Sequence, residues 1–150
     1  MCLGIKKMIK VLSKNISEGD NSSGSYKLLA LSSPEPDYRL AWLLNNALSI
    51  NLQRDLSISL TKESPSFAVF MDNENESGTK YTLLSNKNRE EGSVFFSEFH
   101  AVDFFLKISD TSDRATFDDL HIKIKSIAEI SACIPLVLKK KSTRYFFDNL

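Results

Sequence analysis

The sequence predicts an α+β domain with a mainly antiparallel sheet of five to six strands and two main helices on one face. Several short segments are continuously apolar or alternate between apolar and polar residues, as strands do. Two longer segments repeat their apolar residues at helical spacing. With 150 residues, 42% hydrophobic and 25% charged, the chain has the size and composition of one globular domain.

The first predicted elements are a buried strand and a helix. Residues 26–31 form a short apolar run that ends at a Ser-Ser-Pro sequence, which is typical of a buried strand. A helix is expected over residues 37–49. Ser33 is a good N-cap for it, with Pro34 at the first helical position. Pro36 disfavours helical geometry just before it, so the helix has an equally good start at Pro36.

This helix has more apolar surface than one core stripe needs. On a helical wheel, the core stripe consists of Leu40, Ala41, Leu43, Leu44, Ala47 and Leu48. Tyr38, Trp42 and Asn45 fall on a neighbouring strip, and Arg39 lies beyond that strip. Because surplus aromatic surface often meets a second subunit, a second sheet or a ligand, these four residues are candidate binding residues.

The middle of the chain predicts four more strands. Residues 56–60 and residues 102–108 alternate in polarity, so each of these strands has one apolar face and one wetter face. Residues 67–71 and 81–84 flank the polar loop at 72–79, whose composition suits a hairpin turn. The sheet should therefore be built mainly from neighbouring antiparallel strands.

The C-terminal third predicts a second helix and a last strand. Apolar residues recur at helical spacing over residues 114–128. Residues 132–138 form an apolar run with Pro135 inside it, which indicates an edge strand or a bulge. The strand–helix–strand unit over residues 102–138 resembles half of a ferredoxin-like fold in its pattern.

The two ends of the chain differ from this domain. Residues 1–24 are expected to be a flexible extension, because residues 15–25 are rich in Ser, Asn and Gly, and residues 25–150 form the single domain. The tail carries four cations before Tyr145, Phe146 and Phe147, namely Lys139, Lys140, Lys141 and Arg144. Such a tail could neutralise phosphates and stack bases, or it could be a solvated lysine run whose aromatic residues tuck back onto the core.

Several chemistries find no support in the sequence. The two histidines, His100 and His121, have no evident third partner for a metal site. The glycines never pair at the spacing of a phosphate-binding loop, and no serine sits in a nucleophile elbow. Cys133 lies in an apolar strand and is expected to be a small core residue. We therefore expect no catalytic residue, no metal, no cofactor and no small-molecule ligand.

Charge and cysteine usage restrict the partners and the compartment. Nineteen basic residues balance nineteen acidic ones, so the overall charge does not favour a nucleic-acid partner. No apolar run approaches the roughly 20 residues that span a membrane. Cys2 and Cys133 form no redox or metal-type pair, and no secretory segment is evident. A cytoplasmic protein without a membrane partner is the expectation.

Residues 96–104, with the sequence FSEFHAVDF, resemble the signature of a small bacterial family called IPExxxVDY. Glu98, Val102 and Asp103 match that signature, while Phe96, Ser97 and Phe104 differ from it. Residues 37–42 with Asn45, and residues 84–87, resemble other segments of the same family in the same order. The resemblance covers roughly residues 26–150 and implies no catalytic residues.

Two functions follow as hypotheses. The first is a non-enzymatic protein-interaction module that binds a protein partner or associates with itself through its aromatic surface. The alternative is an RNA- or ribosome-associated binder that uses the basic aromatic tail. Glu98 and Asp103 are candidate binding residues, but they are expected first to cap turns or to pair with a cation such as Arg39.

Overall fold

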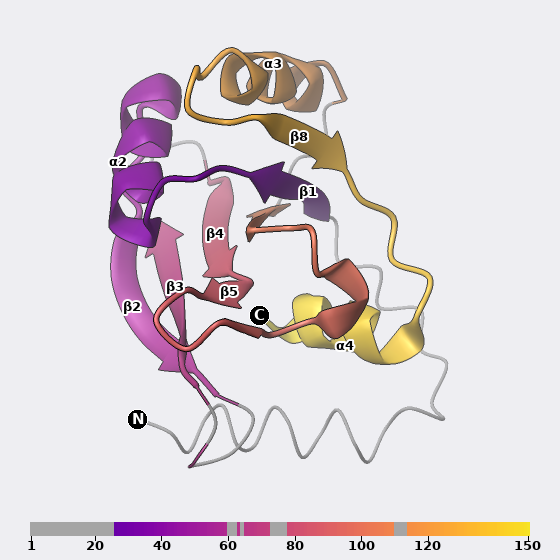
Figure 1. Cartoon of the computed structure of the whole chain (residues 1–150). Coiled ribbons are helices and arrows are strands. Elements are labelled where there is room, and N and C mark those ends of the chain that lie inside the picture. The colour runs from indigo at the N-terminus through magenta and orange to yellow at the C-terminus, as the bar shows by residue number, and fades with distance from the viewer. Residues whose placement is uncertain (1–25, 60–62, 64, 73–77, 110–113) are drawn as a thin grey trace.

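The computed structural model describes residues 26–59, 63, 65–72, 78–109 and 114–150, and the predicted extension at residues 1–24 lies outside them. Within these residues, six strands form an antiparallel sheet in the order β2-β3-β4-β7-β1-β8 (Figure 1). The strands are β1 (Tyr26–Ser32), β2 (Gln53–Ile58), β3 (Phe67–Asp72), β4 (Lys80–Ser85), β7 (Phe104–Ser109) and β8 (Ala132–Pro135). A separate two-stranded sheet pairs β5 (Lys87–Asn88) with β6 (Ser93–Val94).

The helices are α2 (Asp37–Leu48), α3 (Arg114–Lys125) and α4 (Lys141–Asn149), with a short 3-10 turn, η1 (Ser97–Phe99), before β7. The predicted α+β class is confirmed. Helix α2 begins after Pro36, the second of its two predicted starts. Ser33 is not the N-cap, because Pro36 holds that position. The hydroxyl of Ser33 donates to the carbonyl oxygen of Glu129 at 2.7 Å and accepts from the N–H of Glu35 at 3.2 Å.

The strand–helix–strand unit predicted over residues 102–138 is present, and β1 lies between its two strands in the sheet. Strands β7 and β8 both pair antiparallel with β1, so they run parallel to each other on its two sides, and α3 connects them. Residue Leu29 of β1 lies opposite Leu106 on one side and opposite Pro135 on the other. The first strand is thus an interior strand, next to the edge strand β8.

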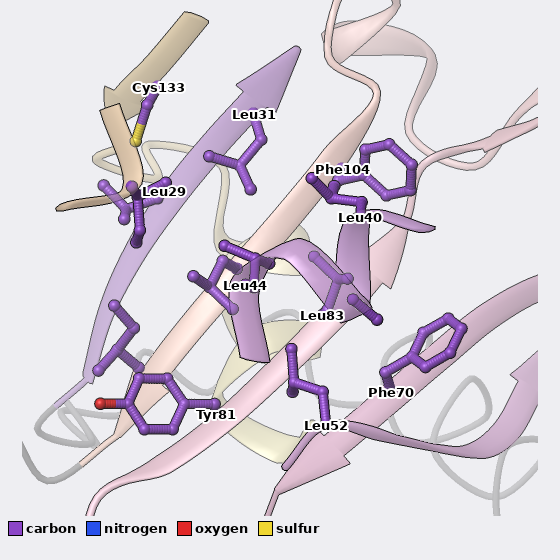
Figure 2. Close-up of a cluster of buried hydrophobic side chains, with 14 of the residues drawn as sticks. Leu29, Leu31, Leu40, Leu44, Leu52, Phe70, Tyr81, Leu83, Phe104 and Cys133 are labelled. Carbon is purple, nitrogen blue, oxygen red and sulfur yellow. The ribbon is translucent and has the colours of Figure 1, made fainter. Parts of the chain in front are cut away.

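Helices α2 and α3 cover the same face of the sheet, as predicted (Figure 1). Leu40 and Leu44 of α2 are fully buried and point onto apolar side chains of β1, β3 and β4 (Figure 2). Ile124 of α3 belongs to the same cluster, together with Cys133 of β8. Of the predicted core stripe of α2, Leu40, Ala41 and Leu44 are buried in this apolar layer and Leu48 packs against it, whereas Leu43 and Ala47 are not part of it.

The opposite face of the sheet is also buried, which corrects the prediction of a wetter face on β7. Phe105 and Lys107 point to this face and are 0% and 7% exposed. Helix α4 covers it with Phe146 and Phe147, which pack with Phe105 in a second apolar cluster. Centroids of Phe105 and Phe147 lie 5.3 Å apart in an edge-to-face arrangement. The domain therefore has three layers.

Strand β8 lies at the edge of the sheet, as Pro135 predicted. The N–H of Leu136 donates to the carbonyl oxygen of Leu28 at 2.8 Å, so alternate residues of this segment face β1. The backbone groups of Cys133 and Pro135 consequently turn outward, and proline removes no bond from the ladder. Nε2 of His121 lies 3.0 Å from the outward carbonyl oxygen of Cys133. This edge is short and partly covered by a side chain.

Candidate interaction surface

The exposed side of α2 carries two large aromatic residues. Tyr38 is 68% exposed and Trp42, one helical turn further on, is 54% exposed. The guanidinium carbon of Arg39 lies 4.7 Å from the centroid of the Trp42 ring, which is a cation–π distance. We call these three residues the aromatic surface. The structure exposes Tyr38 and Trp42 on one side of the helix, as the helical wheel predicted, and places Arg39 against the Trp42 ring.

The core holds α2 firmly beneath the aromatic surface. Leu40, Ala41 and Leu44 are buried on the opposite side of the helix. The side-chain amide of Asn46 donates to the carbonyl oxygen of Trp42 at 2.9 Å. Because the backbone is fixed by packing, the exposed rings are presented from a rigid element, which lowers the entropy lost on binding.

Asn45, the fourth candidate on this helix, does not belong to the aromatic surface. Its Nδ2 donates to the carbonyl oxygen of Leu52 at 3.2 Å, and its Oδ1 accepts from the N–H of Leu52 at 2.7 Å. Both bonds close the loop between α2 and β2. Asn45 therefore has a structural role, which a helical wheel could not show.

Glu98 and Asp103 also have partners within the fold. Oε1 of Glu98 accepts a hydrogen bond of 2.7 Å from the hydroxyl of Thr143, a buried residue of α4. Oδ2 of Asp103 accepts from the N–H of Ser33 at 2.8 Å, and its Oδ1 lies 2.7 Å from Nζ of Lys87. Asp103 therefore bonds a backbone N–H and pairs with a cation, as expected, but the cation is Lys87 rather than Arg39, whereas Glu98 bonds to a hydroxyl group of α4.

Asn86 is the central polar residue of this region and is not among the binding residues that the sequence predicts. It is 0% exposed. Its Nδ2 donates to the carbonyl oxygens of Phe99 and Val102, and its Oδ1 accepts from the N–H of Phe96, each at 2.9 Å. Asn86 thereby fastens the segment that holds η1. Its sequence signal was weak, because it follows a strand at the start of a polar loop.

The tail divides into an exposed basic part and a buried aromatic part. The side chains of its four cations, Lys139, Lys140, Lys141 and Arg144, are exposed. Phe146 and Phe147 are 1% and 0% exposed, so these two rings are not available to stack on bases, whereas Tyr145 is half-buried. Thr143, Phe146, Phe147 and Leu150 follow the i, i+3, i+4, i+7 pattern of a helix, which is the signal that could have predicted α4.

The described residues contain no cluster of three or more His, Cys, Asp and Glu side chains that could hold a metal ion. His100 is exposed, and His121 contacts the backbone of β8. Burial raises the pKa of the Cys133 thiol to about 11, which suppresses the thiolate that a nucleophile requires. In the part of the chain that the structure describes, no helix has the length and apolarity needed to cross a membrane.

No family model matches this chain, and a search of curated proteins finds no significant match. The resemblance to the IPExxxVDY family therefore stays a prediction.

Proposed function

We propose that this chain is a non-enzymatic protein-interaction module that binds a protein partner, or a second copy of itself, through the aromatic surface of α2. The observation that carries the proposal is the 54% exposure of Trp42, the only tryptophan, beside Tyr38 and Arg39. Tryptophan, tyrosine and arginine are the residues most enriched among binding hot spots. A partner that covers them would bury two large rings on a rigid helix.

The contact between Arg39 and Trp42 favours a protein partner with apolar and acidic groups. The guanidinium lies over one side of the indole ring and has no ion pair with another described residue. Its hydrogen-bond donors therefore remain available for a carboxylate on a partner, while the rings supply the apolar contact area. Such an interface would depend mainly on ring burial and only weakly on salt.

Self-association by strand addition is less well supported than association through α2. At one end of the sheet, β8 is short, contains Pro135, and has His121 beside an outward carbonyl. At the other end, the β2–β3 register shifts between Arg54 and Leu56, which marks a bulge. Prolines and bulges are features that prevent edge strands from pairing with other chains. The aromatic surface is therefore the better candidate for a contact between copies.

The test compares Trp42→Ala, a Tyr38→Ala/Trp42→Ala double variant and the control Ile122→Ala. Ile122 of α3 is 65% exposed, so it provides a matched loss of exposed apolar surface on another helix. Sedimentation over a range of protein concentrations measures self-association. Affinity capture from native cytosol, with and without nuclease treatment, measures partner binding.

We expect the parent protein to associate or to retain a protein partner after nuclease treatment. Trp42→Ala and the double variant should lose that contact, and Ile122→Ala should keep it. Because Trp42 is half-exposed, its replacement should change the free energy of unfolding by less than about 1 kcal/mol. Binding that survives the double variant would refute the proposal. Partners that disappear with nuclease would instead support RNA binding through the exposed cations of the tail.

We further propose that the chain is a cytosolic bacterial protein related to the IPExxxVDY family. The support is the resemblance of residues 37–42, 84–87 and 96–104 to segments of that family. The free thiol of Cys133 is consistent with a reducing compartment.

A further inference from the structure

A groove opens where the chain leaves β8. The hydrogen bond from Leu136 to Leu28 is the last pairing between this segment and β1, and Pro135 at the end of β8 lies opposite Leu29. Tyr26 and Lys27, the first two residues of β1, therefore lie beyond the end of the segment that pairs with β1 on the β8 side. The groove has a volume of about 370 Å³ and is lined by Tyr26, Lys27, Leu28, Phe117, Pro135, Leu136, Val137, Leu138, Arg144 and Asp148.

The walls of this groove are mainly apolar. Leu28 is buried, and Leu136 and Leu138 are half-buried against the cluster beneath α4. Val137 is 82% exposed, which is the highest exposure among the large apolar residues in the described part of the chain. An apolar residue at the rim of a groove gains contact area when a ligand covers it. The volume lies at the lower end of the range for small-molecule sites.

The acidic residue of the groove has a hydrogen-bond partner within the described part of the fold, whereas its basic residues have no ion-pair partner there. The hydroxyl of Tyr26 donates to Oδ1 of Asp148 at 2.6 Å. Burial, reinforced by this carboxylate, raises the pKa of Tyr26, so its hydroxyl stays protonated and remains a donor. Nζ of the buried Lys107 lies 4.8 Å from the centroid of the Tyr26 ring, on the same side of the sheet. Among the described residues that line the groove, the only carboxylate is thus already engaged from within the fold.

The two cations of the groove lack such a partner. Lys27 and Arg144 form no ion pair with any residue that the structure describes, and Nζ of Lys27 lies 5.9 Å from the centroid of the Phe117 ring. Arg144 and Asp148 are one turn apart on α4, and both line the groove together with the apolar residues of its walls. A planar guanidinium binds a carboxylate through two parallel hydrogen bonds. Asp148 would oppose an anion of higher charge, such as a phosphate dianion.

We propose that this groove binds a small amphipathic carboxylate. Its carboxylate pairs with the guanidinium of Arg144, and its hydrocarbon body covers Leu136 and Leu138, with Val137 at the rim. The groove lies beside α4 and the end of β8, whereas the aromatic surface lies on α2, so the two sites are independent.

The test uses octanoate as the probe, with octylamine and 1-octanol as probes of the same chain length and different charge. The full chain is titrated with each probe by NMR, with the methyl groups of Leu136, Val137 and Leu138 as reporters. We expect saturable shifts with octanoate and none with octylamine. 1-Octanol should bind at least about tenfold more weakly than octanoate.

Two variants and a control locate the site. Arg144→Gln should weaken octanoate binding by about tenfold or more, because it removes the paired charge. Val137→Asp should abolish binding, because it places a carboxylate at the apolar rim. Lys141→Gln, which removes an exposed charge from the same helix outside the groove, should bind octanoate like the parent. Each variant is checked for an unchanged melting temperature.

Equal binding of octanoate and 1-octanol, equal weakening by Lys141→Gln and Arg144→Gln, or shifts confined to other methyl groups would overturn the proposal. The absence of any octanoate shift in the parent would overturn it as well. The Tyr38→Ala/Trp42→Ala double variant should bind octanoate normally, so failure of one proposal is distinguishable from failure of the other.

Discussion

Replacing Asn86 by alanine tests whether one buried amide holds the segment between β4 and β7 in place. The side chain makes hydrogen bonds to the backbone of Phe96, Phe99 and Val102, each at 2.9 Å. Alanine leaves all of these backbone groups without their partner. The backbone bonds of residue 86 itself, to Phe95 and Asp103, do not depend on its side chain.

The expected cost follows from these contacts. An ordinary intramolecular hydrogen bond contributes about 1 kcal/mol net, so the loss of the Asn86 contacts should reduce the free energy of unfolding by about 3 kcal/mol. With a urea dependence of about 2 kcal/mol per molar, this loss lowers the urea midpoint by about 1.5 M. Because residue 86 is 0% exposed, water cannot readily replace the amide.

Urea unfolding followed by far-ultraviolet circular dichroism measures this change, and Asn46→Ala is the matched control. Asn46 is exposed, and its side chain makes one bond within α2, to the carbonyl oxygen of Trp42. Alanine is also the better helix former. The control should therefore stay within about 0.5 kcal/mol of the parent.

The outcome that refutes this reasoning is an Asn86→Ala midpoint as close to the parent as that of Asn46→Ala. In that case, the segment that contains η1 is held by its apolar contacts, and the amide network adds nothing. Hydrogen exchange at the N–H of Phe96 provides a second readout, because this group donates to the Asn86 side chain. Its protection should fall in the Asn86 variant and remain in the control.

Two further predictions concern buried groups. Phe147→Ala removes a fully buried ring and should cost about 3–5 kcal/mol in the same urea assay, and a cost below about 1 kcal/mol would show that α4 is not part of the core. Burial raises the pKa of Cys133 from 9.0 to about 11, so between these values the unfolded thiol ionises while the folded one keeps its proton. The free energy of unfolding of a Cys2→Ser variant should therefore fall as the pH rises through that window, and more steeply than in Cys2→Ser/Cys133→Ala. Identical pH dependence in the two proteins would contradict this assignment.

Most of the fold was predictable because the strands and the first two helices carry clear apolar periods. The alternation in residues 102–108 and the helical spacing over residues 114–128 both led to elements at those places, β7 and α3. The position of Pro135 indicated an edge strand, which β8 is. In each case, a local pattern and the tertiary packing agree.

The second covered face of the sheet could not be predicted from β7 alone. In the sequence, Phe105 and Lys107 fall on the face of β7 that was expected to be more polar, yet both side chains are buried. The reason lies in another part of the chain, where α4 is short and begins at the end of a lysine run. Burial of Lys107 also depends on Tyr26, whose ring lies over its ammonium group.

The candidate site was predictable in part. The helical wheel identified the exposed strip with Tyr38 and Trp42, because exposure on a helix follows from its period. It could not separate Asn45 from that strip, since Asn45 bonds to a loop that follows the helix. The partners of Glu98 and Asp103 come from distant parts of the sequence, and no local pattern reports such pairs.

The position of β1 between β7 and β8 has a consequence for how the chain folds as it is synthesised. β1 begins at Tyr26, but its partners are β7, which begins at Phe104, and β8, which begins at Ala132. At about 5–20 residues per second, a ribosome needs several seconds to supply them after β1 has emerged. During that time the apolar residues 28–31 have no sheet to join. We expect the growing chain to depend on chaperones that hold apolar strands, and its rate of folding to be set by these distant pairings rather than by its helices.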